Sequence, residues 1–271
     1  MTTRSTLGTA LVTGASSGIG ATYADRLARR GYDLILVARD RSRLQQLAKQ
    51  LSGLSGVKAE VLRADLTVPA ELRKVEERLR TDQSITALVN NAGITAPRQI
   101  VGADPDRLEL AIQLNIVAVT RLAAAAASGF ATRGTGTIIN VASVLALAPE
   151  ITSGVYSGSK AYVLNFSQSL HQELNASGVR VQAVLPGLTR TELWERSGID
   201  VNTLPQDKVM SVGELVDAAL AGLDQGELVS IPSLPDVADW NAFELARLNL
   251  GPNLSHRHAA TRYNVHESNA A

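Results

Sequence analysis

Short apolar runs alternate with helix-length amphipathic stretches along most of this chain. The runs are rich in β-branched residues, as are strands that are buried on both faces of a parallel sheet. We expect strands at Thr9–Thr13, Asp33–Ala38, Val57–Arg63, Ala87–Asn90, Gly136–Val141, Arg180–Leu185 and Glu227–Ile231. We expect helices at Gly18–Arg30, Ser42–Leu51, Pro69–Thr81, Pro105–Phe130, Val155–Ala176 and Val212–Asp224. This alternation predicts an α/β fold of right-handed β-α-β units, with a doubly wound parallel β-sheet flanked by helices.

The length of 271 residues is sufficient to bury a full core in one large α/β domain. No proline- and glycine-rich linker, change of composition or internal repeat divides the chain. We therefore expect a single domain over residues 1–250, including a segment at about 188–212 that folds over a ligand. Residues 251–271 are polar and weakly patterned, and we expect a C-terminal tail there.

The charge balance and the composition exclude several classes of function. With 26 basic and 26 acidic side chains, nothing indicates nucleic acid or a membrane as a partner. The absence of cysteine excludes disulfides, thiolate metal sites and a cysteine nucleophile, and it fits a reducing compartment. The polar N-terminus is too short for a signal sequence, and the apolar run Ala118–Ala127, which contains Arg121, is shorter than a membrane span. We expect a soluble cytoplasmic protein.

Three of the four histidines lie near the C-terminus, at His256, His258 and His266. A His-x-His pair can bind a metal ion, but here no carboxylate cluster accompanies it beyond Glu267. A solvated tail is the better interpretation, and we expect no metal site.

A glycine-rich turn follows the first expected strand and precedes an amphipathic helix. Its sequence from Thr13 to Gly20 places glycines at positions 14, 18 and 20, with Ser16, Ser17 and Ile19 between them. A tight strand-to-helix turn without Cβ atoms lets backbone amides approach a pyrophosphate at a helix N-terminus. The alternative is a plain turn, but its place at the first strand–helix junction favours nucleotide binding.

The second expected strand ends at Ala38 and is followed by Arg39 and Asp40. In dinucleotide folds an acidic residue here binds the ribose 2′-hydroxyl, whereas an arginine accommodates a 2′-phosphate. Arg39, with Arg41 and Arg43 close behind, favours NADP(H), and NAD(H) remains possible. The simpler role for Asp40 is to cap the next helix.

Tyr156 and Lys160 are separated by one helical turn, so a helix places both on one face. A free phenol has a pKa of about 10 and is a poor proton-transfer group near neutrality. A neighbouring cation favours the phenolate, and we expect Lys160 to lower the pKa of Tyr156 toward working pH. Most tyrosine–lysine pairs with this spacing are surface helix contacts. Whether this pair is catalytic depends on the other motifs in the chain.

Three further sequence features are candidates for the same site as Tyr156 and Lys160. Asn115 lies within an apolar helical stripe, either as a structural plug or as a functional group that faces the cleft. Ser143 follows an expected strand at the sheet edge where α/β proteins bind ligands, and no histidine is placed to activate it as in a hydrolase. Pro186 and Gly187 follow the sixth strand and lead into the segment expected to cover a ligand.

Taken together, these motifs resemble the single-domain short-chain dehydrogenase/reductase family, and the resemblance covers about residues 7–231. The matching elements are T-G-A-S-S-G-I-G at 13–20, Asp65-Leu66, N-N-A-G at 90–93, Asn115, Ser143, Tyr156, Lys160 and P-G-x-x-x-T at 186–191. The resemblance implies a Rossmann-like sheet that binds NAD(P) across the carboxyl ends of its strands. It also implies a homodimer or homotetramer formed through the helices 105–130 and 155–176.

The resemblance further assigns roles. Tyr156 is the general acid–base, Lys160 lowers its pKa and binds the nicotinamide ribose, Ser143 holds the substrate oxygen, and Asn115 keeps a water that links Lys160 to solvent. The residues implied to bind the cofactor are Gly14, Ser16, Ser17, Gly18, Ile19, Gly20, Arg39, Asp65, Leu66, Asn91, Ala92, Gly93, Tyr156, Lys160, Pro186, Gly187, Thr189 and Thr191. Family members that use NADP often have a basic residue just before the second glycine, and this chain has Ser17.

The function that we expect is NAD(P)-dependent hydride transfer between nicotinamide and a carbonyl or secondary alcohol, with NADP(H) favoured. One alternative is a catalytically inactive NADP-binding sensor or scaffold with the same fold. A dehydratase or epimerase is a third possibility, although glycine spacing and length usually differ in those relatives. Apolar residues at 144–155 and 188–212 indicate a non-ionic substrate.

Overall fold

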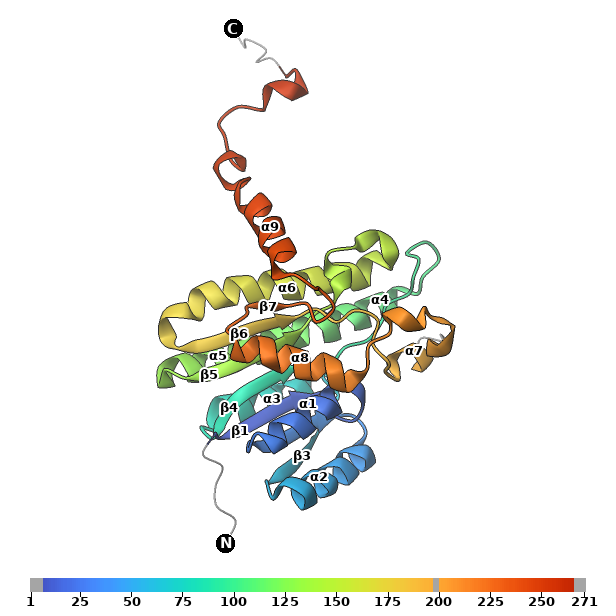
Figure 1. The fold of residues 1–271 in the computed structure, drawn as a ribbon, viewed down its shortest axis with the longest axis vertical. Helices are drawn as coiled ribbons and strands as arrows, with labels where there is room; N and C mark the ends of the chain where they lie inside the picture. Colours follow the sequence, from blue (N-terminus) through green and yellow to red (C-terminus); the bar gives the residue numbers. More distant parts are fainter. Residues whose placement is uncertain (1–6, 197–199, 266–271) are drawn as a thin grey trace. The chain divides into compact units, whose positions relative to one another are not determined.

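The computed structural model describes residues 7–196 and 200–265, and its contacts divide the chain into two units, residues 1–232 and 233–271 (Figure 1). The first unit contains the sheet and all the residues predicted for the site. The division predicted after residue 250, with a substrate segment at about 188–212, stays a prediction.

The first unit is built on a seven-stranded sheet in which every pairing is parallel. The strands are β1 (Thr9–Thr13), β2 (Asp33–Ala38), β3 (Ala59–Arg63), β4 (Ile85–Asn90), β5 (Gly136–Val141), β6 (Val179–Val184) and β7 (Val229–Ser230). Their order is β3-β2-β1-β4-β5-β6-β7, so the direction of winding reverses between β1 and β4. The doubly wound Rossmann-like fold is therefore confirmed, and the reversal marks where such sheets bind ligands at the carboxyl ends of their strands.

Helices cover both faces of the sheet (Figure 1). One core cluster packs α1 (Gly18–Arg29), α2 (Arg41–Ser55) and α8 (Val212–Asp224) against the sheet. The other packs α3 (Pro69–Thr81), α5 (Val119–Arg133) and α6 (Gly154–Leu174) against it. Both layers follow from the sequence, because the central strands β1, β4 and β5 are apolar on both faces and each face needs a cover.

The remaining elements of the first unit are short, apart from α4 (Pro105–Ile112). They are the π-helical turn η1 (Gln113–Ala118), α7 (Leu193–Arg196) and the 3₁₀ turns η2 (Val144–Ala146), η3 (Pro149–Ile151), η4 (Asn175–Ser177), η5 (Val201–Thr203) and η6 (Gln206–Lys208). Most of the 3₁₀ turns lie in the segments after β5 and β6, where the chain crosses the carboxyl edge of the sheet.

The strand β3 differs from the expectation that every strand is buried on both faces. It begins at Ala59 rather than at Val57, and its residues are exposed or only partly buried. The reason is its position at the edge of the sheet, where only β2 pairs with it. The charged side chains of Glu60 and Arg63 are tolerated in this strand for the same reason.

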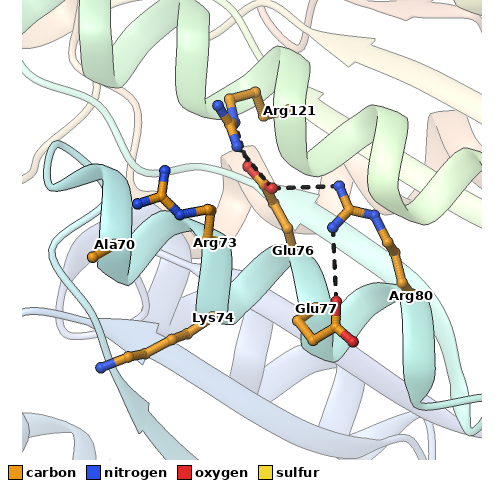
Figure 2. Close-up of a pocket in the computed structure, with 7 residues that line it drawn as sticks. All are labelled: Ala70, Arg73, Lys74, Glu76, Glu77, Arg80 and Arg121. Carbon is orange, nitrogen blue, oxygen red and sulfur yellow. Dashed lines mark hydrogen bonds and ion pairs between the residues drawn. The ribbon is translucent and has the colours of Figure 1, made fainter.

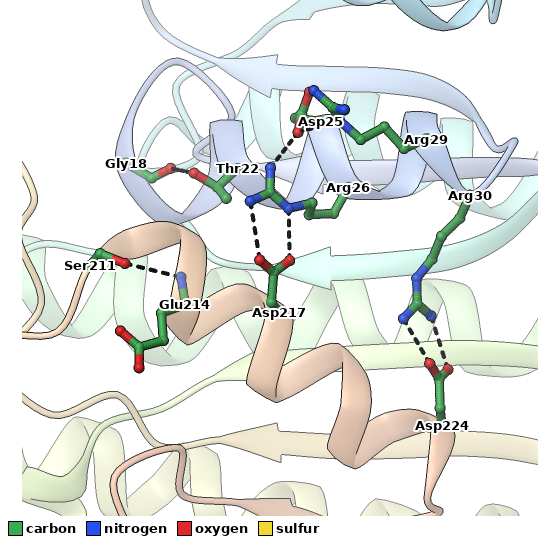
Figure 3. A network of polar contacts seen from close by, with 10 residues as sticks. All are labelled: Gly18, Thr22, Asp25, Arg26, Arg29, Arg30, Ser211, Glu214, Asp217 and Asp224. Atoms are coloured by element: carbon green, nitrogen blue, oxygen red, sulfur yellow. Dashed lines mark hydrogen bonds and ion pairs between the residues drawn. The ribbon is translucent and has the colours of Figure 1, made fainter.

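Two bidentate ion pairs join α1 to α8 (Figure 3). Arg26 contacts Asp217 at 2.7 and 3.2 Å, and Arg30 contacts Asp224 at 2.9 and 2.7 Å. The hydrogen bonds to Asp217 and Asp25 raise the pKa of Arg26 above its ordinary value, against the opposing effect of burial. These pairs fix the helix that begins at the glycine turn against its neighbour, although exposed pairs of this kind contribute only about 0–1 kcal/mol each.

The helix expected at 105–130 is continuous over Pro105–Arg133, with η1 inserted in its middle. By length and composition alone this segment could cross a membrane, since an 18-residue window has a mean hydropathy of 1.6. Half of that window is buried within the protein, as in the core helices of many soluble proteins. The alanines at 123 and 125–127 are buried and let this helix approach its neighbours closely.

The second unit contains α9 (Val237–Leu248) and the 3₁₀ turns η7 (Gly251–Asn253) and η8 (Thr261–Tyr263). Asp236 caps α9 by accepting a hydrogen bond from the Ala238 amide at 2.8 Å. The rings of Trp240 and Phe243, three residues apart on α9, contact each other with centroids 5.4 Å apart. His266 and Glu267 lie outside the described residues.

Candidate active site

The glycine turn joins the carboxyl end of β1 to the first turn of α1. Gly14 and Gly18 have φ angles of +66° and +53°, which L side chains rarely adopt. A Cβ at Gly20 would lie 2.3 Å from the Gly14 carbonyl oxygen and 2.5 Å from Nδ2 of Asn91. The motif therefore needs glycine for backbone conformation at two positions and for close packing at the third.

The N-N-A-G segment after β4 is hydrogen-bonded to this turn. Asn91 Nδ2 donates to the carbonyl oxygens of Thr13 and Gly14 at 3.0 and 3.3 Å. The Thr13 hydroxyl donates to the Val89 carbonyl and accepts from the amides of Asn91 and Ala92 at 3.0 and 3.1 Å. Two loops that are distant in sequence thus form one rigid rim at the reversal of winding.

The rim fits a pyrophosphate by its shape and its donors. Backbone at Gly14 and Gly20 is free of Cβ atoms, and the N-terminus of α1 begins directly behind the turn. Ser16, Ser17 and Ile19 belong to the same turn, and Ile19 packs against the core beneath it. Thr191 lies next to the turn, with its Cγ2 atom 3.4 Å from where a Cβ of Gly18 would lie. These residues could hold a dinucleotide, and their binding of the cofactor stays a prediction.

The carboxyl ends of β2 and β3 lie next to this rim. Arg39 is exposed directly after β2, and Asp40 caps α2 by accepting a hydrogen bond from the Arg43 amide at 3.0 Å, which confirms its expected role. The Asp65 carboxylate accepts bonds from the Thr67 amide and hydroxyl at 3.0 and 2.6 Å. Burial raises the pKa of Asp65, but the Thr67 bonds and the charge of Arg39 outweigh it and leave the pKa below its ordinary value. Leu66 is buried in the core beside it.

Ser143 and Tyr156 meet beyond the carboxyl end of β5. Ser143 follows the strand, caps the turn η2 by accepting from the Leu145 amide at 3.2 Å, and donates to the Pro186 carbonyl at 3.4 Å. A hydrogen bond between Ser143 and Tyr156 also lowers the pKa of the phenol, although burial has the larger effect and raises it to about 12. The serine hydroxyl and the phenol therefore point into the same place.

Lys160 is buried below Tyr156 on the same face of α6. Its Nζ atom lies 5.7 Å from the centre of the Tyr156 ring and donates to the Val141 carbonyl at 2.9 Å. Burial lowers the pKa of Lys160 to about 8. Burial has the larger effect on the pKa of Tyr156 and the bond with Ser143 opposes it, and the lowering of this pKa by Lys160 stays a prediction.

Asn115 lies in the π-helical turn η1 and is buried. Its side chain accepts from the Ile94 amide at 3.0 Å and donates to the Ile94 carbonyl at 2.9 Å and to Ser159 Oγ at 3.2 Å. It therefore fixes the loop after β4 to the helix α6. Gly93 lies close to both Asn115 and Lys160, since a Cβ there would be 3.2 Å from Asn115 Oδ1 and 3.6 Å from Lys160 Nζ. Asn115 therefore has the structural role, in which its amide bonds local backbone. Its link to solvent through a water stays a prediction.

The segment after β6 is held by hydrogen bonds among its own residues between 186 and 210. Pro186 accepts hydrogen bonds from Ser143 and from the Val144 amide, and Gly187 accepts from the Thr189 hydroxyl at 3.0 Å. Thr189 pairs with Met210 in an isolated bridge, and the Trp194 indole donates to the Thr189 carbonyl at 2.7 Å. Thr189 and Thr191 are thus held near the rim, and residues 197–199 of this segment lie outside the described chain.

Sequence reasoning missed the partners that position the predicted residues. They are the carbonyl of Val141, the backbone of Ile94, the hydroxyl of Ser159 and that of Thr13. Backbone groups carry no residue signature. Thr13, at the end of an apolar strand, was visible as a polar side chain in apolar surroundings, whereas Ser159 lies among other small and polar residues.

A hollow of about 650 Å³ lies elsewhere, between α3 and α5 (Figure 2). None of the predicted site residues lines it. Its buried carboxylate, Glu76, pairs with Arg121 and with Arg80, and the Arg121 hydrogen bond holds the pKa of Glu76 below its ordinary value. This is an ion-pair network that joins two helices. Within the described residues, no group of three or more His, Asp or Glu side chains is placed to hold a metal ion.

Comparison with known proteins agrees with this geometry. The sequence model of the short chain dehydrogenase family matches residues 8–202. An uncharacterized oxidoreductase from Staphylococcus saprophyticus is 34% identical over 223 residues, which cover 82% of this chain and 93% of that protein.

Two solved structures are similar over 94% of the chain. A short-chain dehydrogenase from Sphingobium yanoikuyae in complex with NADPH has 54% identity and a TM-score of 0.92, and 99% of that chain is covered. A bulky-bulky ketone specific alcohol dehydrogenase from Comamonas testosteroni has 48% identity and a TM-score of 0.87, with 98% covered.

Proposed function

The chain belongs to the short chain dehydrogenase family, and from that premise we propose that it transfers a hydride between NADP(H) and a ketone or secondary alcohol. The observation that carries this proposal is the convergence of Ser143, Tyr156 and Lys160 beyond the carboxyl end of β5. A serine hydroxyl, a phenol and a buried ammonium in that arrangement can bind a carbonyl oxygen and move one proton.

The residues that would hold the cofactor are those of the glycine rim, Asn91 to Gly93, Arg39, Asp65, Lys160 and the turn Pro186 to Thr191. When bound, the nicotinamide supplies or accepts the hydride. Ser143 orients the substrate oxygen by hydrogen bonding, and Tyr156 gives its proton to that oxygen in reduction or removes one in oxidation. Lys160 is held by the Val141 carbonyl and places a positive charge beside the phenol. Asn115 acts as a positioning residue, because it ties Ile94 to α6.

A preference for NADP(H) over NAD(H) rests on Arg39. Its exposed guanidinium follows β2, close enough to Asp65 to lower the pKa of that carboxyl, and could pair with a 2′-phosphate. Titration of purified protein with NADPH and with NADH, followed by fluorescence, tests the preference. Equal dissociation constants for the two cofactors would remove it.

We propose a ketone with two bulky apolar substituents as the substrate class. The similarity to the bulky-ketone alcohol dehydrogenase supports this, and so do the apolar side chains of Val144, Leu145 and Leu147 next to Ser143. A panel of diaryl, aryl-alkyl and small or charged ketones, assayed with NADPH, tests the class. Faster turnover of the small or charged ketones would contradict it.

The central experiment compares Tyr156→Phe with Tyr162→Phe, a matched change one turn and a half along α6. Tyr162 is exposed and its hydroxyl lies 2.9 Å from the Thr120 hydroxyl. Loss of the general acid–base should lower kcat by about 10²–10⁴-fold while NADPH still binds, whereas the control retains activity. Wild-type protein that binds NADPH and reduces none of the panel would instead favour an inactive sensor or scaffold of the same fold.

We also propose a cytoplasmic homodimer or homotetramer. The lack of cysteine suits a reducing compartment, and α4 and α6 carry exposed apolar side chains, Leu110, Ile112 and Tyr162, that a second copy could cover. Light scattering of the purified protein and fractionation of the cells that produce it test the two statements. A monomer, or recovery with the membrane or the medium, would contradict them.

A further inference from the structure

An ion pair connects the adenosine side of the site to the segment that follows β6. Arg43, in the first turn of α2, donates through Nη1 to Glu192 Oε2 at 2.7 Å. The Nε atom of the same guanidinium lies 3.6 Å from the Asp40 carboxylate. The two partners of the closer pair are 149 residues apart in sequence, and both are half-exposed.

Glu192 belongs to the stretch between β6 and α7, which is held by hydrogen bonds to its neighbours. It lies between Thr191, which faces the glycine turn, and α7. Thr189 is bridged to Met210 at the base of the segment, and Trp194 donates to the Thr189 carbonyl. Glu192 is therefore two residues from Trp194, in a stretch that is held at Thr189 by Met210 and by the Trp194 indole.

Arg43 is also one of the three arginines that follow β2, where a 2′-phosphate would be bound. Its positive charge is already shared between two carboxylates, Asp40 and Glu192. A 2′-phosphate carries up to two negative charges and binds a guanidinium more strongly than a single carboxylate does. The phosphate and Glu192 thus compete for one cation.

We propose that Arg43 is a specificity-determining residue shared by the 2′-phosphate of NADP(H) and Glu192, so that binding of the phosphate breaks the Arg43–Glu192 pair and frees Glu192 from α2. The inference rests on the proposed NADP(H) site. It has two consequences: Glu192 weakens the binding of 2′-phosphorylated ligands, and those ligands change the environment of Trp194.

Adenosine 2′,5′-bisphosphate and 5′-AMP separate the effect of the phosphate from that of the nicotinamide. The chain has two tryptophans, so a Trp240→Phe background leaves Trp194 as the single reporter. In that background we expect the bisphosphate to change the Trp194 emission, and 5′-AMP to leave it unchanged. Glu192→Gln should abolish the change, because the ion pair is already broken.

Affinity measured by calorimetry gives the second readout. Glu192→Gln should tighten the bisphosphate about two- to fivefold at low salt, with 5′-AMP unaffected and the gain lost at high salt. Glu244→Gln, which removes a half-buried carboxylate paired with Arg247 in the second unit, is the control and should change the binding of neither ligand. In an Arg43→Gln background, Glu192→Gln should have no further effect.

Unchanged or weaker binding of the bisphosphate by Glu192→Gln would overturn the inference while leaving the proposed function intact. An equal gain for 5′-AMP would also overturn it, because the effect would then not involve the 2′-phosphate. Wild-type protein that binds neither NADPH nor the bisphosphate would overturn the proposed NADP(H) site itself.

Discussion

The ammonium of Lys160 lies 5.7 Å from the centre of the Tyr156 ring and gives a hydrogen bond to the Val141 carbonyl at the end of β5. Burial of the two groups acts in opposite directions, raising the pKa of Tyr156 to about 12 and lowering that of Lys160 to about 8. At neutral pH the phenol is therefore protonated beside a charged lysine, which is the state that donates a proton to a carbonyl oxygen.

The buried charge of Lys160 predicts a specific dependence of stability on pH. Its pKa is about 8 when folded and near 10.5 when unfolded, so between these values the unfolded state binds more protons. The free energy of unfolding attributable to Lys160 should therefore rise from pH 8 to 10.5, by about 3 kcal/mol in total. Below pH 8 the cost of burying the charge is fully present.

Lys160→Met isolates this contribution. Urea unfolding of both proteins at several pH values gives the difference in free energy of unfolding, wild type minus variant, in which the titration of the buried tyrosines cancels. That difference should increase between pH 8 and 10.5. A difference that stays flat over this range would show that Lys160 keeps its ordinary pKa.

Ser143→Ala should raise the pKa of Tyr156 further, since the Ser143 hydrogen bond is what opposes the effect of burial. Alcohol oxidation requires the phenolate, so the rise of kcat/KM with pH should move to higher pH in the variant. Ser157→Ala, which removes a hydroxyl bonded to the Ser153 carbonyl in the same helix, should leave the profile in place. An unshifted profile for Ser143→Ala would refute the coupling.

The fold was largely predictable because each strand and helix carries its own periodicity. The ranges Thr9–Thr13, Asp33–Ala38 and Gly136–Val141 agree residue for residue with the structure. The edge strand β3 was placed too early and its burial overestimated, because sequence periodicity does not state which strands lack a neighbour. The π-helical turn at Asn115 was also not predicted, since the insertion depends on how the helix packs.

The proximity of three predicted site residues could be predicted from the sequence, but the pKa values of two of them could not. Motif spacing brought Ser143, Tyr156 and Lys160 together because each lies at a strand end or on a helix next to one. The spacing of Tyr156 and Lys160 says nothing about burial, and burial decides both pKa values. In the same way, Glu192 was invisible as a partner of Arg43, because an ion pair across 149 residues has no local signature.

Asn115→Ala should destabilise the protein by about 1–3 kcal/mol, because it leaves the half-buried amide and carbonyl of Ile94 without the partners seen here. Chemical denaturation gives the loss, and hydrogen exchange should show faster exchange of the Ile94 amide. Asn175→Ala, an exposed position after α6, should stay within about 0.5 kcal/mol of wild type. If Asn115→Ala also lost no more than about 0.5 kcal/mol of stability, other contacts would have to hold Ile94 in place.

Two glycine substitutions separate the need for space from the cost of helical glycine. At Gly20 a Cβ would lie 2.3 Å from the Gly14 carbonyl oxygen, and at Gly53, within α2, no heavy atom lies within 4 Å of it. Gly20→Ala should therefore destabilise the protein and abolish NADPH binding, because the rim must open. Gly53→Ala should stabilise it by about 0.5–1 kcal/mol through the reduced entropy of the unfolded chain, with NADPH binding unchanged. Thermal unfolding and NADPH titration of both variants measure these effects, and tight binding by Gly20→Ala would show that the rim does not hold the cofactor.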